Sequence, residues 1–316
     1  MKIAFVFPGQ GSQSIGMLDS FRDNAAVQSI VTRASSALGQ NIGALIGTGP
    51  AEELNLTVNT QPALLTASYA MYAAWRAAGG AEPLIVAGHS LGEYTALVAA
   101  GALELEDAVR LVRFRAQAMQ EAVPVGIGSM AAILGLADEV VQQACSEAAQ
   151  GEVVEPVNFN APAQVVIAGH YSAVERACEI AKRLGAKRAV PLTVSAPFHS
   201  SLLQPASDRL RERLAQATLK KARIDLINNV DVSIESEPTR IAEALARQAA
   251  SPVRWADTIR KMSALGVTHL VECGPGRVLS GLTKRIAPSL ESLVVNDTAT
   301  LASTLAALRV PTSSNL

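Results

Sequence analysis

The sequence predicts an α/β protein in which a large domain with buried parallel strands is interrupted by a ferredoxin-like insertion. Short apolar runs stop at glycine-rich turns and are followed by helical segments, as in parallel sheets. Between residues 129 and 194 the order changes to β-α-β-β-α-β, the split βαβ pattern. We therefore expect a large domain over 1–125 and 199–310, a subdomain over 126–198 and a flexible tail over 311–316.

The elements of the N-terminal part follow from apolar runs and the residues that end them. The first strand stops at Pro8-Gly9, and the first long helix has a proline near its start and Gly79-Gly80 at its end. The expected elements are, in order, strand 3–7, helix 61–78, strand 84–87, helix 91–100 and helix 107–122. The helix over 91–100 contains only small and apolar residues in its C-terminal half, which predicts burial.

The insertion and the C-terminal part are predicted in the same way. For the insertion we expect strand 129–134, helix 137–148, strand 153–158, strand 164–168, helix 172–184 and strand 187–194. After it we expect helix 239–250, strand 269–272, helix 278–286 and strand 293–295. The return to alternating helices and strands indicates that the chain re-enters the large domain.

Composition excludes several classes of protein. The 316 residues are 49% hydrophobic, which is ample for a buried core, and no apolar run reaches membrane-spanning length. A net charge of -1 and 4% aromatic residues argue against nucleic acid as a partner. The three cysteines, Cys145, Cys178 and Cys273, lie far apart, form no metal-ligand spacing and suit a reducing cytoplasm. We expect no metal and no membrane partner.

Ser90 is the candidate nucleophile. It lies in Gly88-His89-Ser90-Leu91-Gly92, a G-x-S-x-G sequence placed between an expected strand and an expected helix, which is the context of a nucleophile elbow. A helix that begins at Leu91 directs its free N–H groups and the positive end of its dipole at the serine oxygen. The Leu91 N–H could therefore stabilise an oxyanion. The alternative is a tight turn whose glycines serve only close packing.

His199 is the candidate base among four histidines. His89 adjoins the serine and is expected to pack in the core, while His170 and His269 lie at strand ends. His199 lies in "SAPFHSS", the loop where the chain re-enters the large domain, and such loops often carry catalytic groups. No acid between Ser90 and His199 stands in a motif, so a carbonyl could orient the histidine instead.

Arg115 falls on the apolar side of the helix predicted over 107–122. The apolar stripe at helical spacing consists of Ala108, Leu111, Val112, Met119 and Ala122. A buried guanidinium needs an anionic partner, because leaving it unpaired is costly. Two interpretations remain open from the residues alone: an internal salt bridge to a nearby Asp or Glu, or a bidentate clamp for a substrate carboxylate.

A set of motifs, taken in order, resembles one family closely. The motifs are "FVFPGQGSQ", "TQPALLTAS", "AGHSLGEY", "PVNFNAP", "QVVIAGH", "APFHS", "NNV" and "ECGPGRVLSGLTKR". They are similar to those of the malonyl-CoA:acyl carrier protein transacylases of bacterial fatty acid synthesis, over residues 2–308. The resemblance implies an α/β core like that of hydrolases with a ferredoxin-like subdomain, and transfer of malonyl from malonyl-CoA to the phosphopantetheine thiol of acyl carrier protein through a malonyl-serine intermediate.

The resemblance also implies roles for individual residues. Ser90 would be the nucleophile, His199 the general base and Arg115 the residue that holds the malonyl carboxylate. It further implies four binding or orienting residues: the N–H groups of Gln10 and Leu91 as the oxyanion hole, the carbonyl of Gln248 as the group that orients the histidine, and Asn160 at the entrance. No cofactor is implied. The implied partners are malonyl-CoA and an acidic acyl carrier protein, and we expect a monomer in the cytoplasm.

Two other functions fit the elbow. A serine esterase or thioesterase would give the acyl group to water and needs no inward arginine. A non-catalytic scaffold or carrier-binding protein would form no acyl-enzyme. Measuring transfer to a holo carrier against transfer to water separates the first from a transferase, and detection of an acyl-serine excludes the second.

Overall fold

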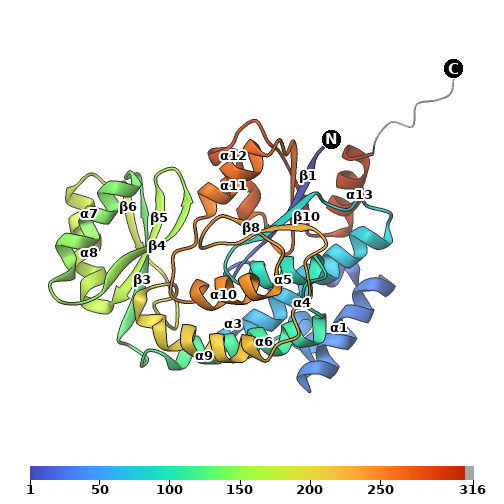
Figure 1. The fold of residues 1–316 in the computed structure, drawn as a ribbon, viewed down its shortest axis with the longest axis horizontal. Coiled ribbons are helices and arrows are strands. Elements are labelled where there is room, and N and C mark those ends of the chain that lie inside the picture. The colour runs from blue at the N-terminus through green and yellow to red at the C-terminus, as the bar shows by residue number, and fades with distance from the viewer. Residues whose placement is uncertain (310–316) are drawn as a thin grey trace.

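The computed structural model describes residues 1–309 and contains two separate sheets (Figure 1). The larger sheet has the strand order β10-β9-β1-β2-β7-β8. Its strands are β1 (Ile3–Phe7), β2 (Ile85–Gly88), β7 (Asp225–Ile227), β8 (Ile234–Glu235), β9 (His269–Cys273) and β10 (Glu291–Val295). All neighbours are parallel except β7 and β8. The predicted α/β class is confirmed.

Helices cover this sheet. They are α1 (Ala25–Leu38), α2 (Ile42–Thr48), α3 (Ala51–Asn55), α4 (Thr57–Ala77), α5 (Gly92–Ala99), α6 (Leu105–Glu121), α9 (Gln204–Ala215), α10 (Pro238–Gln248), α11 (Trp255–Ala264), α12 (Val278–Ile286) and α13 (Thr298–Ala307), with short 3₁₀ turns at Asp19–Phe21 and Ser201–Leu203. All five residues of β1 are buried, because apolar side chains pack on both of its faces: Phe5 and Phe7 on one, Ala4 and Val6 on the other.

The smaller sheet is antiparallel and has the order β4-β5-β3-β6. Its elements are β3 (Gly128–Leu134), α7 (Asp138–Ala149), β4 (Val154–Ala161), β5 (Gln164–His170), α8 (Tyr171–Arg183) and β6 (Arg188–Pro191). The two helices pack on one face of the sheet around a separate hydrophobic core (Figure 1). The predicted β-α-β-β-α-β order is therefore present, and the domain boundaries at residues 126 and 198 stay a prediction.

Most predicted elements have slightly different limits in the structure, and two of the differences have a clear physical reason or consequence. The helix expected from Gln61 begins at Thr57, so Pro62 lies inside α4 and not at its start. The backbone carbonyl of Leu56 accepts the N–H groups of Asn59 and Thr60, and this first turn is complete before the proline is reached. The strand expected over 187–194 is shorter, because β6 ends at Pro191. The following residues instead line a cleft between the two sheets.

The tail predicted over 311–316 lies outside the described residues. Within residues 1–309, none of the helices combines the length and the apolar character that a membrane crossing requires. The same part of the chain contains no group of three or more His, Cys, Asp or Glu side chains arranged to hold a metal ion.

Candidate active site

Ser90 lies at the turn between β2 and α5 in a left-handed backbone conformation, with φ of 52°. The turn is tight: a Cβ atom at Gly92 would lie 2.1 Å from the Phe7 carbonyl oxygen. The Asn229 side chain holds the turn from the other side, accepting the Ser90 N–H at 2.8 Å and donating to the Gly88 carbonyl at 2.7 Å. A residue other than glycine at position 92 could not make this approach, which explains the spacing of the motif.

The structure brings His199 to the serine from 109 residues further along the chain. Its Nε2 lies 2.7 Å from Ser90 Oγ, and its Nδ1 lies 2.8 Å from the Gln248 carbonyl oxygen. Because a carbonyl can only accept, Nδ1 carries the proton and Nε2 is free to accept the serine proton. The imidazole is 4% exposed. Burial, together with the nearby charge of Arg115, lowers the pKa of His199 to about 3.

Arg115 points from α6 into the same site and is 2% exposed. Its Nη1 donates to Gln61 Oε1 at 2.7 Å, and its Nη2 donates to Gln248 Oε1 at 2.9 Å and to Ser90 Oγ at 3.2 Å. Its guanidinium carbon lies 5.4 Å from the centre of the Tyr94 ring. Within residues 1–309 the arginine has no carboxylate at ion-pair distance, so neutral amide oxygens hold its charge.

The remaining predicted site residues surround the serine. Gln10 and Leu91 line the cleft, and in the described part of the chain neither backbone N–H is used in a hydrogen bond. The Gln10 side chain instead donates to Thr57 Oγ1 at 2.9 Å. Asn160 also lines the cleft, and its Oδ1 lies 2.8 Å from His89 Nε2. An oxyanion hole requires free N–H donors that face the reacting group.

The other three histidines take no part in the Ser90–His199 pair. His89 packs edge-on against Trp255, and burial lowers its pKa. His170 accepts the backbone N–H of Val153, and His269 lies 3.1 Å from Glu291. The packing of His89 agrees with the core position expected for it.

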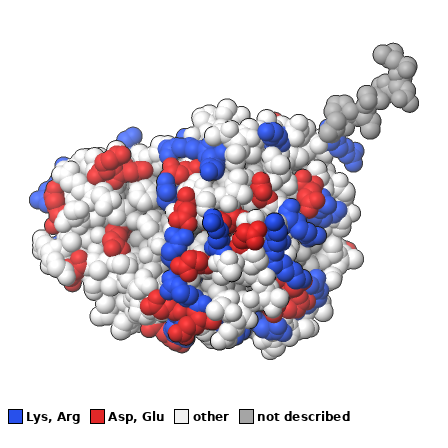
Figure 2. Space-filling model, in the orientation of Figure 1, with Lys and Arg blue, Asp and Glu red and all other residues white. Residues whose placement is uncertain are grey.

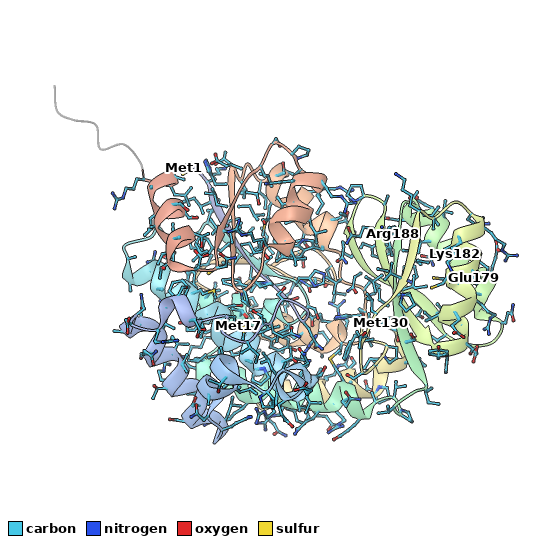
Figure 3. The ribbon with its side chains drawn as sticks, turned by 180° about the vertical axis from the view of Figure 1, so that it is seen from behind. Met1, Met17, Met130, Glu179, Lys182 and Arg188 are labelled. Carbon is cyan, nitrogen blue, oxygen red and sulfur yellow. The ribbon has the colours of Figure 1, made fainter. Side chains whose placement is uncertain are left out.

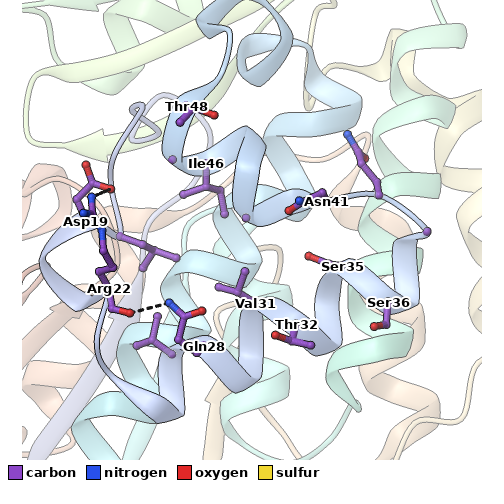
Figure 4. Close-up of a pocket in the computed structure, with 16 residues that line it drawn as sticks. Asp19, Arg22, Gln28, Val31, Thr32, Ser35, Ser36, Asn41, Ile46 and Thr48 are labelled. Atoms are coloured by element: carbon purple, nitrogen blue, oxygen red, sulfur yellow. Dashed lines mark hydrogen bonds and ion pairs between the residues drawn. The ribbon is translucent and has the colours of Figure 1, made fainter.

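The site opens into a cleft of about 790 Å³ between the two sheets. Residues of the larger sheet and its helices form one wall, and Met130, Asn158 and Val166 of the smaller sheet belong to the other. A second depression, of about 840 Å³, lies between α1 and α2 (Figure 4). None of the predicted site residues lines it, so its size does not make it the better candidate.

Three residues that contact the site were not assigned a role from the sequence. Gln61 binds Arg115, Asn229 holds the turn, and Glu93 accepts hydrogen bonds from Gln248 and Asn229. All three lie in motifs that carry the family resemblance, "TQPALLTAS", "NNV" and "AGHSLGEY". Their position within those motifs is the sequence feature that could have identified them as site residues.

An α/β core that presents a Ser–His pair and a buried arginine in one cleft suits acyl transfer, and comparison with known proteins places the chain in the class of acyl transferases. The model of the acyl transferase domain family matches residues 4–303. Within that class the chain belongs to the malonyl-CoA:acyl carrier protein transacylase family. It is 53% identical to the malonyl CoA-acyl carrier protein transacylase of Escherichia coli K12, over 96% of this chain and 99% of that one.

Solved structures agree with this assignment. The acyl-carrier-protein S-malonyltransferase of Burkholderia pseudomallei 1710b is 63% identical, with a TM-score of 0.96, covering 97% of this chain and 100% of that one. A malonyl-transacylase in complex with its type II PKS acyl-carrier protein is 50% identical, also with a TM-score of 0.96, covering 97% and 100%. The chain is therefore an acyltransferase with the fold of these enzymes.

Proposed function

We propose that this acyltransferase moves a malonyl group from malonyl-CoA to the phosphopantetheine thiol of an acyl carrier protein, through a malonyl-serine intermediate. The observation that carries the proposal is the placement of Ser90 Oγ, 2.7 Å from a base, His199, and 3.2 Å from a buried cation, Arg115. The first contact suits nucleophilic attack, and the second suits an acyl group that ends in a carboxylate.

In the first half-reaction, His199 Nε2 takes the Ser90 proton as Oγ attacks the thioester carbonyl carbon. The N–H groups of Gln10 and Leu91 stabilise the negative charge that develops on the carbonyl oxygen. When the C–S bond breaks, coenzyme A leaves as a thiolate and receives the proton from His199. The Gln248 carbonyl stabilises the charged imidazole, in place of the acid of a triad.

In the second half-reaction the proton moves in the opposite direction, from a different thiol through His199 to Ser90. His199 takes the proton of the carrier thiol, the thiolate attacks the malonyl-serine, and Ser90 leaves with that proton. Arg115 holds the malonyl carboxylate in both half-reactions, and Asn160 lines the entrance. The proposed reaction uses no cofactor, and water must be kept from the ester for the thiol to compete.

The setting of the reaction is part of the same proposal. We further propose that the protein acts as a monomer. Three reduced, buried cysteines support a cytoplasmic location, and the carrier is proposed to be an acidic protein of fatty acid synthesis. The large domain over 1–125 and 199–310 and the subdomain over 126–198 would form the two walls of the cleft.

Intact-mass measurement tests the mechanism. The protein incubated with malonyl-CoA should gain one malonyl group, and addition of holo carrier should remove it and malonylate the carrier. Ser90→Ala should gain none, and His199→Ala should load about 10²- to 10⁴-fold more slowly, the usual share of general base catalysis. Loss of the adduct to water at the same rate without a carrier would favour an esterase, and no adduct at all would favour a scaffold.

A further inference from the structure

A second buried carboxyl group lies behind the site. Glu93 is in the first turn of α5, three residues after the serine, and is 1% exposed. Its Oε2 accepts the Gln248 side-chain N–H at 2.8 Å and the Asn229 backbone N–H at 3.0 Å. The proposed acyl transfer assigns no step to this carboxyl group. Burying a carboxyl group costs free energy unless hydrogen bonds compensate it, so its two hydrogen bonds need an explanation.

Gln248 connects Glu93 to the arginine. Its Nε2 donates to Glu93 and, at 3.0 Å, to the Ser90 carbonyl, while its Oε1 accepts from Arg115 Nη2 at 2.9 Å. A side-chain amide has two donors on one end and an acceptor on the other. Only one orientation therefore satisfies all three neighbours. Rotating the amide by half a turn would place its N–H groups against the guanidinium and its oxygen against Glu93.

The orientation of Arg115 depends on this amide. Gln61 holds Nη1 and Gln248 holds Nη2, so the two glutamines fix the plane of the guanidinium from opposite ends. A bidentate contact with a carboxylate requires that plane to be fixed, since both N–H groups must meet both oxygens at once. Gln61 belongs to α4, and its hold on Nη1 does not involve Glu93. Glu93 therefore acts on one of the two ends only.

We propose that Glu93 is a positioning residue for acyl selectivity: it holds the Gln248 side-chain amide so that Oε1 faces Arg115, and thereby aligns the guanidinium with the carboxylate of the acyl group. This inference rests on the proposed malonyl transfer and assigns to Glu93 the preference for an acyl group with a free carboxylate. The Gln248 main chain, which faces His199, does not contact Glu93, so the base keeps its partner when Glu93 changes.

Loading of Ser90 by malonyl-CoA and by acetyl-CoA, each measured as kcat/KM, tests the inference in two variants. Glu93→Leu removes the acceptor and should lower malonyl loading about 10- to 100-fold more than acetyl loading, the usual effect of leaving a buried donor unpaired. Glu93→Gln keeps an oxygen at the position of Oε2 and should retain the malonyl preference within a few fold. Glu272→Gln is the matched control, because Glu272 is a buried carboxyl that accepts two N–H groups at the start of α12.

Each outcome decides one claim. If Glu93→Leu keeps the wild-type ratio of malonyl to acetyl loading, or lowers both rates equally, Glu93 does not set selectivity. If Glu93→Gln loses the ratio as fully as Glu93→Leu, the charge matters and not the amide orientation, which also overturns the inference. Should Glu93→Leu fail to fold, Glu93→Asp, which withdraws the acceptor by one methylene, replaces it with the same expected loss. Failure of the wild type to form a malonyl-serine would overturn the proposed function itself.

Discussion

The Ser90 hydroxyl lies between two side chains, one that donates a hydrogen bond to its oxygen and one that accepts its proton. Arg115 Nη2 can only donate, so Oγ accepts from it, while His199 Nε2 is an acceptor because Nδ1 donates to Gln248. The serine O–H therefore points at the histidine before any substrate arrives. Since the arginine charge also lowers the pKa of His199, an acyl carboxylate that neutralises this charge would make the histidine a stronger base.

Replacing Arg115 tests which acyl groups the site accepts. Arg115→Ala should abolish most malonyl loading and spare acetyl loading, because acetyl has no carboxylate to hold. A lost buried charge contact is worth about 3–5 kcal/mol, or roughly two to four decades of malonyl preference. The measurement pairs acyl-CoA selectivity with the thermal midpoint of the same variant.

The control is Arg113→Ala, which removes a half-buried arginine of the same helix that donates to Gln40. It should leave selectivity unchanged. A fall of many degrees in the midpoint of Arg115→Ala with unchanged selectivity would return that arginine to a purely structural role.

Glu93 should make stability depend on pH. Burial raises the pKa of Glu93 to about 7 in the folded protein, above the ordinary value of 4.5. Protonation therefore favours the folded state: its contribution is fully present below about pH 4.5 and is lost as pH rises through 7. The loss amounts to about 3 kcal/mol at most.

Comparing the wild type with Glu93→Gln isolates the contribution of Glu93 to the free energy of unfolding, because the two proteins have all other titratable groups in common. Denaturant unfolding between pH 5 and 8 should show the free energy of unfolding of the wild type falling relative to the variant, with most of the change below pH 7.5. A difference that stays constant over this range would mean that the carboxyl is already ionised at pH 5 in the folded protein.

At the scale of elements, the β2–Ser90–α5 turn is tightly constrained. A methyl group at Gly92 would collide with the backbone of β1, at 2.1 Å from the Phe7 carbonyl oxygen. Gly92→Ala should therefore displace the serine, abolish acylation and lower the free energy of unfolding by about 1–3 kcal/mol, as overpacking does. Acyl-enzyme formation and denaturant unfolding measure the two effects.

Gly281→Ala provides the comparison in α12. A Cβ there has no heavy atom within 4 Å, so the exchange should stabilise the protein by about 0.5–1 kcal/mol and leave acylation intact. Equal effects of the two substitutions would mean that tight packing at position 92 is not what the elbow requires.

The sequence predicts an element well where the residues that define its limits lie within the element or next to it. The run over Ile3–Phe7 and the helix over Val278–Ile286 are predicted with their observed limits, because apolar periodicity and punctuation are local. The start of α4 is missed by four residues, since the proline inside it resembles an N-terminal signal. Several helices, among them α1, α9 and α11, are not predicted, although their buried residues recur at helical spacing and this signal is local.

Local sequence patterns likewise predict some residues of the candidate site and not others. The inward direction of Arg115 follows from its place on a helical stripe, and the elbow follows from two glycines around Ser90. The residues around Gln61 and Asn229 in the sequence do not predict which groups these two side chains bind. Asn229 meets the serine from 139 positions away, and no local pattern encodes a pairing over that distance. Only the tertiary structure brings these amides to the site.

On the scale of the whole molecule, Figure 2 shows charges of both signs interspersed over the face in view. The net charge is -1, so attraction of an acidic carrier has to come from local basic pairs. Among the adjacent basic pairs of the sequence, the candidates are Lys182-Arg183, Lys187-Arg188 and Lys284-Arg285. Lys182 binds Glu179 on α8, a helix that covers one face of the smaller sheet, and both residues lie away from the cleft residue Met130 (Figure 3).

The pair in α12 is placed differently. Val278, Leu279 and Leu282 of that helix line the cleft, and Lys284 follows them within one turn. Arg285 donates to the Pro162 carbonyl at 2.8 Å and to the side chain of Gln164, which is itself a cleft residue. In the described part of the chain Lys284 is exposed and has no ion-pair partner, so its charge is available to a protein that approaches the cleft.

Lys284 should therefore steer the carrier to the cleft. Transfer from malonyl-enzyme to carrier should slow as salt is raised, since screening weakens attraction between exposed charges, while acylation by malonyl-CoA should change less. Lys284→Glu should slow the carrier step several-fold at low salt, by an order of magnitude at most, and reduce its salt dependence, whereas Lys182→Glu should do neither. Stopped-flow or quench measurement of each half-reaction separates the two steps. An equal salt response in both half-reactions, or an equal effect of the two substitutions, would show that the carrier docks without help from this end of α12.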